Sequence, residues 1–242
     1  MKALEHFRRQ NREDNILARQ EIEEAIPLAP DYHSFYVLLA ATHINELWYG
    51  SESLLDSLAR ASELVDKALA LNKEDPDAYI VLSYLCLMKR QYEEAIAAAE
   101  RAVALNPNGA DAYAQLANSL VASDKSTEAI ELYNKAIRLN PMPPSYYFHQ
   151  LGHASIGVGQ LEEATRAYEK AIQLEPTNLF AHLGLAAAYI RMGLQEKARA
   201  SAGEVLRLDP KFSLNSHEKL IPQKNRDRIR NYVDALRKAG LK

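Results

Sequence analysis

The chain of 242 residues contains little cysteine, glycine or proline: one cysteine, nine glycines and ten prolines. The single cysteine, Cys86, excludes a disulfide within the chain and is typical of a reducing compartment. No stretch approaches the roughly 18 consecutive apolar residues that a membrane span needs. The first residues, MKALEHFRRQNRED, contain no apolar segment, so we expect no signal peptide. These absences favour a cytoplasmic protein that has no membrane partner.

A strong charge of one sign is also lacking. The chain has 29 Lys and Arg against 32 Asp and Glu, a formal net charge of −3, so we expect no nucleic-acid partner. It contains no Gly-rich phosphate loop, Gly-x-Ser-x-Gly elbow, Cys-x-x-Cys pair or His-Glu-x-x-His motif. We therefore expect that the protein is not an enzyme, with no catalytic residues, no metal site and no cofactor.

The chain does contain a repeat. Three sets of residues recur at intervals of 34, 35 and 34 positions: Ala95, Ala129, Ala164 and Ala198; Leu82, Leu116, Leu151 and Leu185; Pro107, Pro141, Pro176 and Pro210. A fixed period of this size indicates stacked supersecondary units, each too small to bury its own apolar face. Such an array offers a long surface for holding a partner.

Each repeat has the pattern of two helices. In repeat 110–144, apolar residues from Tyr113 to Leu120 recur at i, i+3, i+4 and i+7, which places them on one side of a helix. The polar stretch VASDKS then breaks the pattern, and a second apolar stripe runs from Ala129 to Ile137. Pro141 ends this second helix, because the residue before a proline is pushed out of the helical region.

This pattern resembles the tetratricopeptide repeat (TPR) of 34 residues. Four consecutive repeats match it; repeat 145–178, for example, supplies Phe148, Leu151, Gly152, Ala164, Tyr168, Ala171 and Pro176. The resemblance implies an all-α fold, a right-handed α-solenoid of helix-turn-helix repeats. We expect the array to cover residues 1–212, with repeats at about 1–32, 33–75, 76–109, 110–144, 145–178 and 179–212. A linker and a capping helix would follow in residues 213–242.

Two departures from the period predict local differences. One extra residue lies in the turn 141–144, and nine residues are inserted between Leu39 and Ala61. We interpret this insertion, which includes 46–50 (ELWYG), as a lengthened first helix followed by an aromatic elbow. After the last repeat, residues 212–224 read as irregular. The apolar stripe from Ile229 to Ala239 predicts a helix that covers the exposed face of the last repeat.

A narrower resemblance comes from three segments, at 87–113, 139–152 and 206–242 (for example LNPMPPSYYFHQLG). Together they resemble the TPR region that follows the catalytic domain in bacterial class III adenylate and guanylate cyclases. The resemblance implies a regulatory, protein-binding part of a bacterial signalling protein. The chain contains nothing that matches the cyclase domain itself.

In resembling domains the first helix of each repeat lines a concave groove. Carried over, the groove positions are Asp77, Ile80, Tyr84, Met88, Asp111, Asn118, Tyr146, His149, His153, Phe180 and Arg191, with Leu183 and Ile190 on the last repeat. The lysines of the chaperone-binding type of groove are missing. The middle of the groove is rich in aromatic and amide side chains, which suits a peptide or protein segment held by stacking and backbone hydrogen bonds.

Several residues allow two interpretations. His149 and His153 stand four apart and could share a metal, but a polar contact in the groove is the preferred role. Cys86 is expected to be a buried apolar residue, and Trp48 either packs at the elbow or anchors a partner. Residues 219–242 hold eight Lys or Arg and two Asp, which we interpret as the solvated side of the capping helix. The alternative to a binding module is a structural protein that self-associates through the solenoid.

Overall fold

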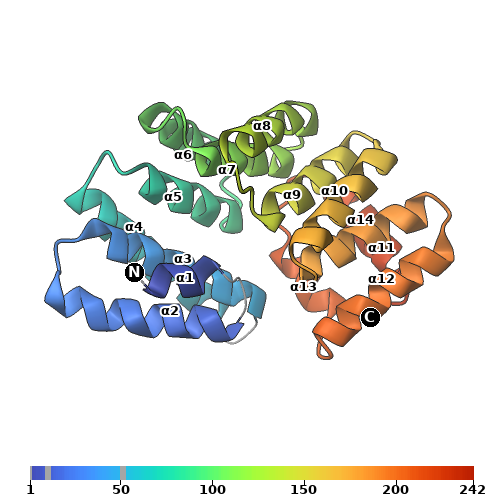
Figure 1. Cartoon of the computed structure of the whole chain (residues 1–242), viewed down its shortest axis with the longest axis horizontal. Helices are drawn as coiled ribbons and strands as arrows, with labels where there is room; N and C mark the ends of the chain where they lie inside the picture. The colour runs from blue at the N-terminus through green and yellow to red at the C-terminus, as the bar shows by residue number, and fades with distance from the viewer. Residues whose placement is uncertain (1, 9–11, 50–52) are drawn as a thin grey trace. The chain divides into compact units, whose positions relative to one another are not determined.

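The computed structural model describes residues 2–8, 12–49 and 53–242, and in these ranges the regular structure is helical, without strands (Figure 1). The all-α fold predicted from the repeats is therefore confirmed. The chain divides into two compact units, unit 1 (Met1–Pro107) and unit 2 (Asn108–Lys242). No helix in the described ranges is long and apolar enough to cross a membrane.

Unit 1 consists of helical hairpins. α3 packs against α4, and α5 packs against α6. Fully buried Ala61, Val65 and Ala68 form the inner side of α4. The helices of unit 1 are α1 (Lys2–Arg8), α2 (Arg12–Ala25), the 3-10 turn η1 (Ile26–Leu28), α3 (His33–Tyr49), α4 (Leu54–Leu71), α5 (Pro76–Met88) and α6 (Tyr92–Leu105).

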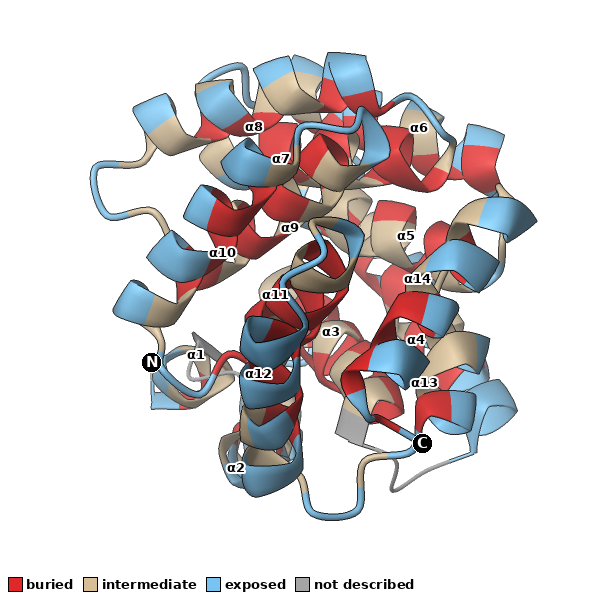
Figure 2. Cartoon of the chain, turned by 90° about the vertical axis from the view of Figure 1, so that its right-hand side faces the viewer, coloured by how far each residue is buried: buried red, intermediate tan, exposed pale blue. Residues whose placement is uncertain are grey.

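Unit 2 contains three more hairpins and two C-terminal helices. Figure 2 shows exposed residues on the outer side of α12 and buried residues on α11, as expected for amphipathic helices around a shared core. The helices of unit 2 are α7 (Ala110–Ala122), α8 (Ser126–Leu139), α9 (Ser145–Gly157), α10 (Leu161–Leu174), α11 (Leu179–Arg191), α12 (Gln195–Leu208), α13 (Leu214–Leu220) and α14 (Arg226–Ala239).

Helices within a repeat approach closely because small residues face large ones. Ala164 and Ala171 of α10 are fully buried, and the ring of Tyr168 on the same helix reaches α9 and α11. A Cβ on Gly152 would lie 2.6 Å from that ring, and one on Gly184 would lie 2.2 Å from it. Only glycine therefore leaves room for this ring, which explains why both positions lack a side chain.

In the four repeats between residues 76 and 212, the turn uses a left-handed residue at one fixed position. Arg90, Asp124, Gly159 and Gly193 have φ of 61°, 69°, 80° and 76°, and they follow the 34- and 35-residue period of the sequence. Glycine adopts this conformation freely, and aspartate tolerates it better than most residues. The turn geometry therefore recurs although the residue changes.

The connection between α8 and α9 runs from Asn140 to Pro144, one residue longer than the connection 175–178 between α10 and α11. The extra residue predicted in the turn 141–144 is thus located. The nine-residue insertion lengthens α3, which has 17 residues where α5 has 13, as predicted. The predicted elbow is partly wrong, because Glu46 to Tyr49 belong to α3; Gly50 lies outside the described residues.

The end of the chain contains one more helix than predicted. Residues 212–224 were expected to be irregular, but α13 forms within them, because the Ser213 hydroxyl accepts a hydrogen bond from the Ser216 N–H and Leu214 is buried. The predicted helix after residue 225 is present as α14. Asn225 caps its start, and Gly240, at φ 110°, ends it.

Candidate partner-binding face

The first helices of the repeats in unit 2, α7, α9 and α11, lie side by side and form one face. We call it the inner face. It carries nine residues that the resemblance places in the groove: Asp111, Asn118, Tyr146, His149, His153, Phe180, Leu183, Ile190 and Arg191. The structure thus brings them onto neighbouring helices. Their role in binding stays a prediction.

At one end of the inner face, polar groups are held in place and remain accessible. The exposed carboxylate of Asp111 accepts hydrogen bonds from the hydroxyls of Tyr146 and Tyr147, the latter at 2.7 Å. Burial is the largest cause that raises the pKa of both tyrosines, and the negative charge of Asp111 is the second. Gln150 donates to the Asn118 side-chain oxygen at 3.3 Å. These residues form a preorganised carboxylate, phenol and amide surface, which we call the open end.

In the middle of the inner face, both histidines are neutral. Asn178 Nδ2 donates to His149 Nδ1 at 3.1 Å, and the Tyr168 hydroxyl is hydrogen-bonded to His153 Nδ1 at 3.0 Å. Burial lowers the pKa of His149 from 6.5 to about 3 and that of His153 to about 4; the proximity of His153 adds to the first shift, and that of His217 and Arg228 adds to the second. The side chains therefore act as hydrogen-bonding and stacking groups at pH 7.

The far end of the inner face is covered by the chain's own C-terminal segment. The ring of Tyr232, on α14, lies 6.0 Å from that of His153 and 6.1 Å from that of His217, on α13. The groove position Leu183 is fully buried in a cluster that includes Val233 and Leu236 of α14. α14 lies beside α11 in unit 2 (Figure 1). The segment predicted as a cap therefore also fills part of the predicted groove.

Polar contacts fix the start of α14 to the turn between α7 and α8. Arg228 pairs with Asp124 and donates to Ser126 at 3.1 Å, while Asn225 donates to Asp124 at 2.9 Å. The hydrogen bond from Asn225 is the largest effect that lowers the pKa of Asp124. Arg228 is thus not one of the solvated charges that the sequence predicts for the tail. Nothing in the local pattern could have shown this, because Asp124 and Arg228 are 104 residues apart.

In unit 1, four predicted groove residues lie along α5. Asp77 is exposed, and Ile80, Tyr84 and Met88 are half-buried. Trp48 Nε1 donates to the Tyr84 hydroxyl at 2.6 Å, and burial raises the pKa of Tyr84 to about 12. Trp48 therefore packs within unit 1, as the first of the two interpretations states.

The remaining candidates for chemistry are Cys86 and the pair His149 and His153. Cys86 is buried, and burial raises the pKa of its thiol, which disfavours the nucleophilic thiolate. The rings of His149 and His153 are 6.0 Å apart and nearly perpendicular. Across the part of the chain that the structure describes, no three His, Cys, Asp or Glu side chains are placed to hold a metal ion.

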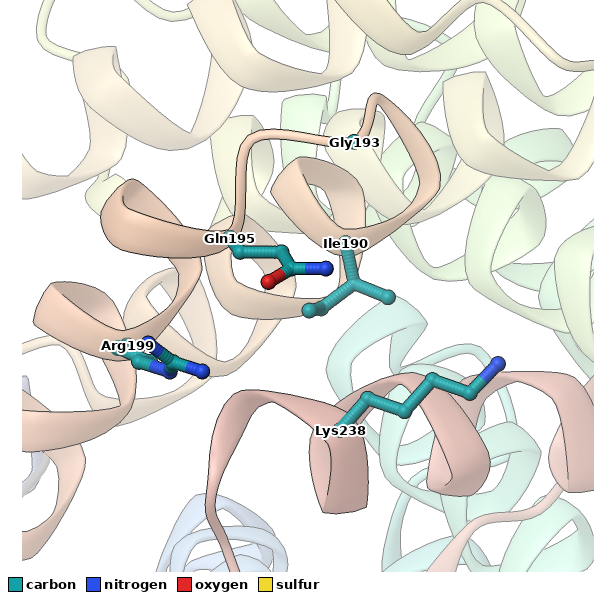
Figure 3. A pocket seen from close by; sticks show the side chains of 5 residues that line it. All are labelled: Ile190, Gly193, Gln195, Arg199 and Lys238. Carbon is teal, nitrogen blue, oxygen red and sulfur yellow. The ribbon is translucent and has the colours of Figure 1, made fainter.

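A shallow pocket of about 450 Å³ opens beside the covered part of the inner face, where the α11–α12 turn meets α14. Figure 3 shows the Arg199 and Gln195 side chains directed toward it, with the stem of Lys238 along its edge. Ile190 and Gly193 complete the lining. The lining carries two cations and no carboxylate, so its electrostatics favour an anionic group over a cationic one.

Family models match a large part of the chain. A model described as "TPR repeat" matches residues 158–193. Two models described as "Tetratricopeptide repeat" match residues 55–110 and residues 181–212. A model described as "Anaphase-promoting complex, cyclosome, subunit 3" matches residues 88–171. The comparison with curated proteins finds no match.

Solved structures with the same fold include TTC0263, a TPR protein of Thermus thermophilus, with 23% identity, TM-score 0.65, and coverage of 84% of this chain and 98% of that chain. The Cut9–Hcn1 assembly of the APC/C is 16% identical, with a TM-score of 0.70; the match covers 86% of this chain and 39% of that chain. PilW, a type IV pilus biogenesis factor, is 15% identical, with a TM-score of 0.63; the match covers 86% of this chain and 88% of that chain. Identities this low show the fold alone.

The stacked hairpins place the chain among the α-solenoid repeat proteins. Its repeats are tetratricopeptide repeats, and the chain carries a TPR domain. Proteins of this class generally act as non-catalytic scaffolds that bind peptides or proteins.

Proposed function

We propose that this chain is a non-catalytic interaction module that binds an extended peptide or protein segment at the open end of the inner face. The observation that carries the proposal is the group formed by Asp111, Tyr146 and Asn118, which is exposed or half-exposed and held by its own hydrogen bonds. A carboxylate accepts from backbone N–H groups, an amide side chain both donates and accepts, and a tyrosine ring stacks. Because these groups are already ordered, little side-chain entropy is lost on binding.

The α5 residues of unit 1 offer a second binding surface of a different character. Ile80 and Met88 are half-buried apolar side chains, with the exposed carboxylate of Asp77 on the same helix. Methionine adapts to irregular apolar surfaces, so this patch suits an apolar side chain of a ligand. We assign this patch, taken by itself, to apolar contacts with a bound segment.

The experiment is affinity capture from native lysate with three forms of the chain. The double variant Tyr146→Ala/Asn118→Ala removes a ring and an amide from the open end. The control, Asn134→Ala, removes an exposed amide from α8, the second helix of the same repeat as Asn118. We expect proteins that bind the wild type and the control but not the double variant, with equal helicity by circular dichroism. Identical protein lists for all three forms would contradict the proposal.

A regulatory role beside a bacterial cyclase is the finer version of this proposal. It rests on the resemblance of segments 87–113, 139–152 and 206–242 to the TPR regions of such enzymes. The test is to measure cyclic nucleotide formation by a class III cyclase domain with and without this chain. A change in rate that the Tyr146→Ala/Asn118→Ala variant does not produce supports the role, and an unchanged rate contradicts it.

Self-association is the second candidate function. Leu28 and Leu55 of unit 1 are 87% and 77% exposed, and Met142 of unit 2 is 85% exposed, so each offers apolar surface that a second copy of the chain could cover. Light scattering over a wide concentration range tests this alternative. A dimer that Leu55→Ser or Met142→Ser dissociates supports it, whereas a monomer at every concentration rejects it.

A further inference from the structure

α14 has the design of a helix bound in a groove. Four of its five buried residues, Ile229, Val233, Leu236 and Ala239, recur at intervals of three or four and form one stripe, with Ala235 beside it. The opposite side is exposed and carries Arg226, Arg230, Asp234, Arg237 and Lys238. The stripe packs in one cluster with Leu183, and the half-buried Phe180 and Ile190 pack against the same cluster. The resemblance places these three α11 residues in the groove, and α14 covers them as a bound helix would.

The surface under α14 makes its polar contacts without α14. The hydrogen bond of His149 comes from Asn178, at the start of α11, and that of His153 involves Tyr168 on α10. Asn178 also donates to Ser145 at 3.1 Å. All these partners lie in α9 to α11, so removing α14 leaves none of these hydrogen bonds broken. The covered surface is therefore preorganised to receive a helix.

The two ends of α14 are held by a few hydrogen bonds, which water or another helix can replace, and by Leu241, which is buried in the same cluster. At its start these are the bonds of Arg228 and Asn225 to Asp124 and the bond of the Lys224 N–H to the Ala122 carbonyl, at 2.8 Å. At the other end, the Leu214 N–H donates to the Lys242 carbonyl at 2.7 Å. Residues 221–225, which precede α14, form no helix. α14 can therefore leave as one piece.

We propose that the surface formed by α11 and α12, with His153 of α9 at its edge, is a receptor for an amphipathic helix, and that α14 is its intramolecular ligand, which a partner helix displaces. The partner has the pattern of α14: an arginine followed by apolar residues at positions +1, +5, +8 and +11, as in Arg228, Ile229, Val233, Leu236 and Ala239. This goes beyond the binding of an extended segment at the open end. It makes access to the covered part of the inner face conditional on the release of α14.

The test uses the full chain and a fluorescent peptide of residues 225–242. A latch variant, Arg228→Ala/Val233→Ala, weakens only the attached helix and leaves the receptor residues unchanged. The control, Arg226→Ala/Arg230→Ala, changes the exposed side of the same helix. Because apparent affinity scales with the fraction of open molecules, we expect the peptide to bind the latch variant at least about tenfold more tightly than the wild type or the control.

Hydrogen exchange of the wild-type chain tests whether α14 opens on its own, even if the latch variant does not fold. We expect the amides of α14 to exchange at least about tenfold faster than those of α9 and α11, because α14 opens on its own. Equal exchange rates in the three helices overturn the proposal. So does a folded latch variant that binds no peptide, or equal binding to all three forms. The peptide test probes only the surface under α14 and uses no lysate. Its failure therefore does not contradict the proposal that a partner binds at the open end.

Discussion

Acidification should destabilise unit 2 through three imidazoles, one buried and two half-buried. His149 and His153 on α9 and His217 on α13 lie with Tyr232 in one aromatic cluster. Burial lowers the pKa of His149 to about 3 and those of His153 and His217 to about 4, from 6.5 in each case. The positive charge of Arg228 further disfavours the protonated form of His153. The folded protein therefore keeps all three rings neutral at pH 5.

The sign of the effect follows from which state binds the proton first. The unfolded chain takes up a proton on each ring as the pH falls through 6.5, whereas the folded chain does so only near pH 3 to 4. Stability is therefore complete above pH 6.5 and falls as the pH decreases toward 4. At pH 5.0, about 1.5 pH units below 6.5, each ring costs about 2 kcal/mol, or roughly 6 kcal/mol for complete unfolding of the cluster.

Urea unfolding followed by circular dichroism at pH 7.5 and pH 5.0 measures this loss. In His217→Phe, an aromatic ring remains beside Phe212 and Tyr232, which lie 5.6 and 6.1 Å from the native ring, but no proton is taken up. We expect this variant to lose about one third less stability than the wild type, a difference of about 2 kcal/mol. A wild type equally stable at both pH values would refute the reasoning, as would a variant with an unchanged loss.

Three further predictions concern the repeat turns, the helix packing and the anchor of α14. Gly159→Ala should destabilise the folded chain by about 1 kcal/mol, because the φ of Gly159 is 80°. Gly203→Ala, inside α12, should stabilise it by roughly 0.5 kcal/mol. Chemical denaturation compares the two variants, and changes of the same sign would contradict the argument from the turn. Gly184→Ala should cost about 1–3 kcal/mol in the same assay, because the new methyl meets the Tyr168 ring, and an unchanged midpoint would show that the ring moves freely. Asp124→Asn keeps a residue that tolerates the left-handed turn but removes the charge that pairs with Arg228, so it should accelerate hydrogen exchange in α14 while exchange in α9 stays unchanged; equal effects on both helices would argue against this anchor.

The helical hairpins could be predicted from the sequence because their information is local and repeated. The apolar stripe from Tyr113 to Leu120 defines a helix and its buried side, and the prolines of the period mark where second helices stop. Fully buried Ala129 and Tyr133 confirm which side faces the neighbouring helix. Four copies of the same pattern make each assignment support the others.

The covering of the inner face could not be predicted in the same way. The stripe on α14 shows that the helix has a buried side, but it contains no information about which surface buries it. The pairing of Arg228 with Asp124 and the stacking of Tyr232 near His153 join residues 104 and 79 positions apart. The short α13 was missed because its seven residues depend on the Ser213 cap and the burial of Leu214 rather than on periodicity.

The most direct test of the central claim, that the inner face binds a protein partner, is site-specific photo-crosslinking in cells. A photoreactive amino acid at Asn118 would report from the open end of the inner face, and the same group at Asn134 would report from the outer helix of the same repeat. We predict a covalent adduct with another protein from position 118 and none from position 134. Adducts from position 134 alone, or from neither position, would contradict it.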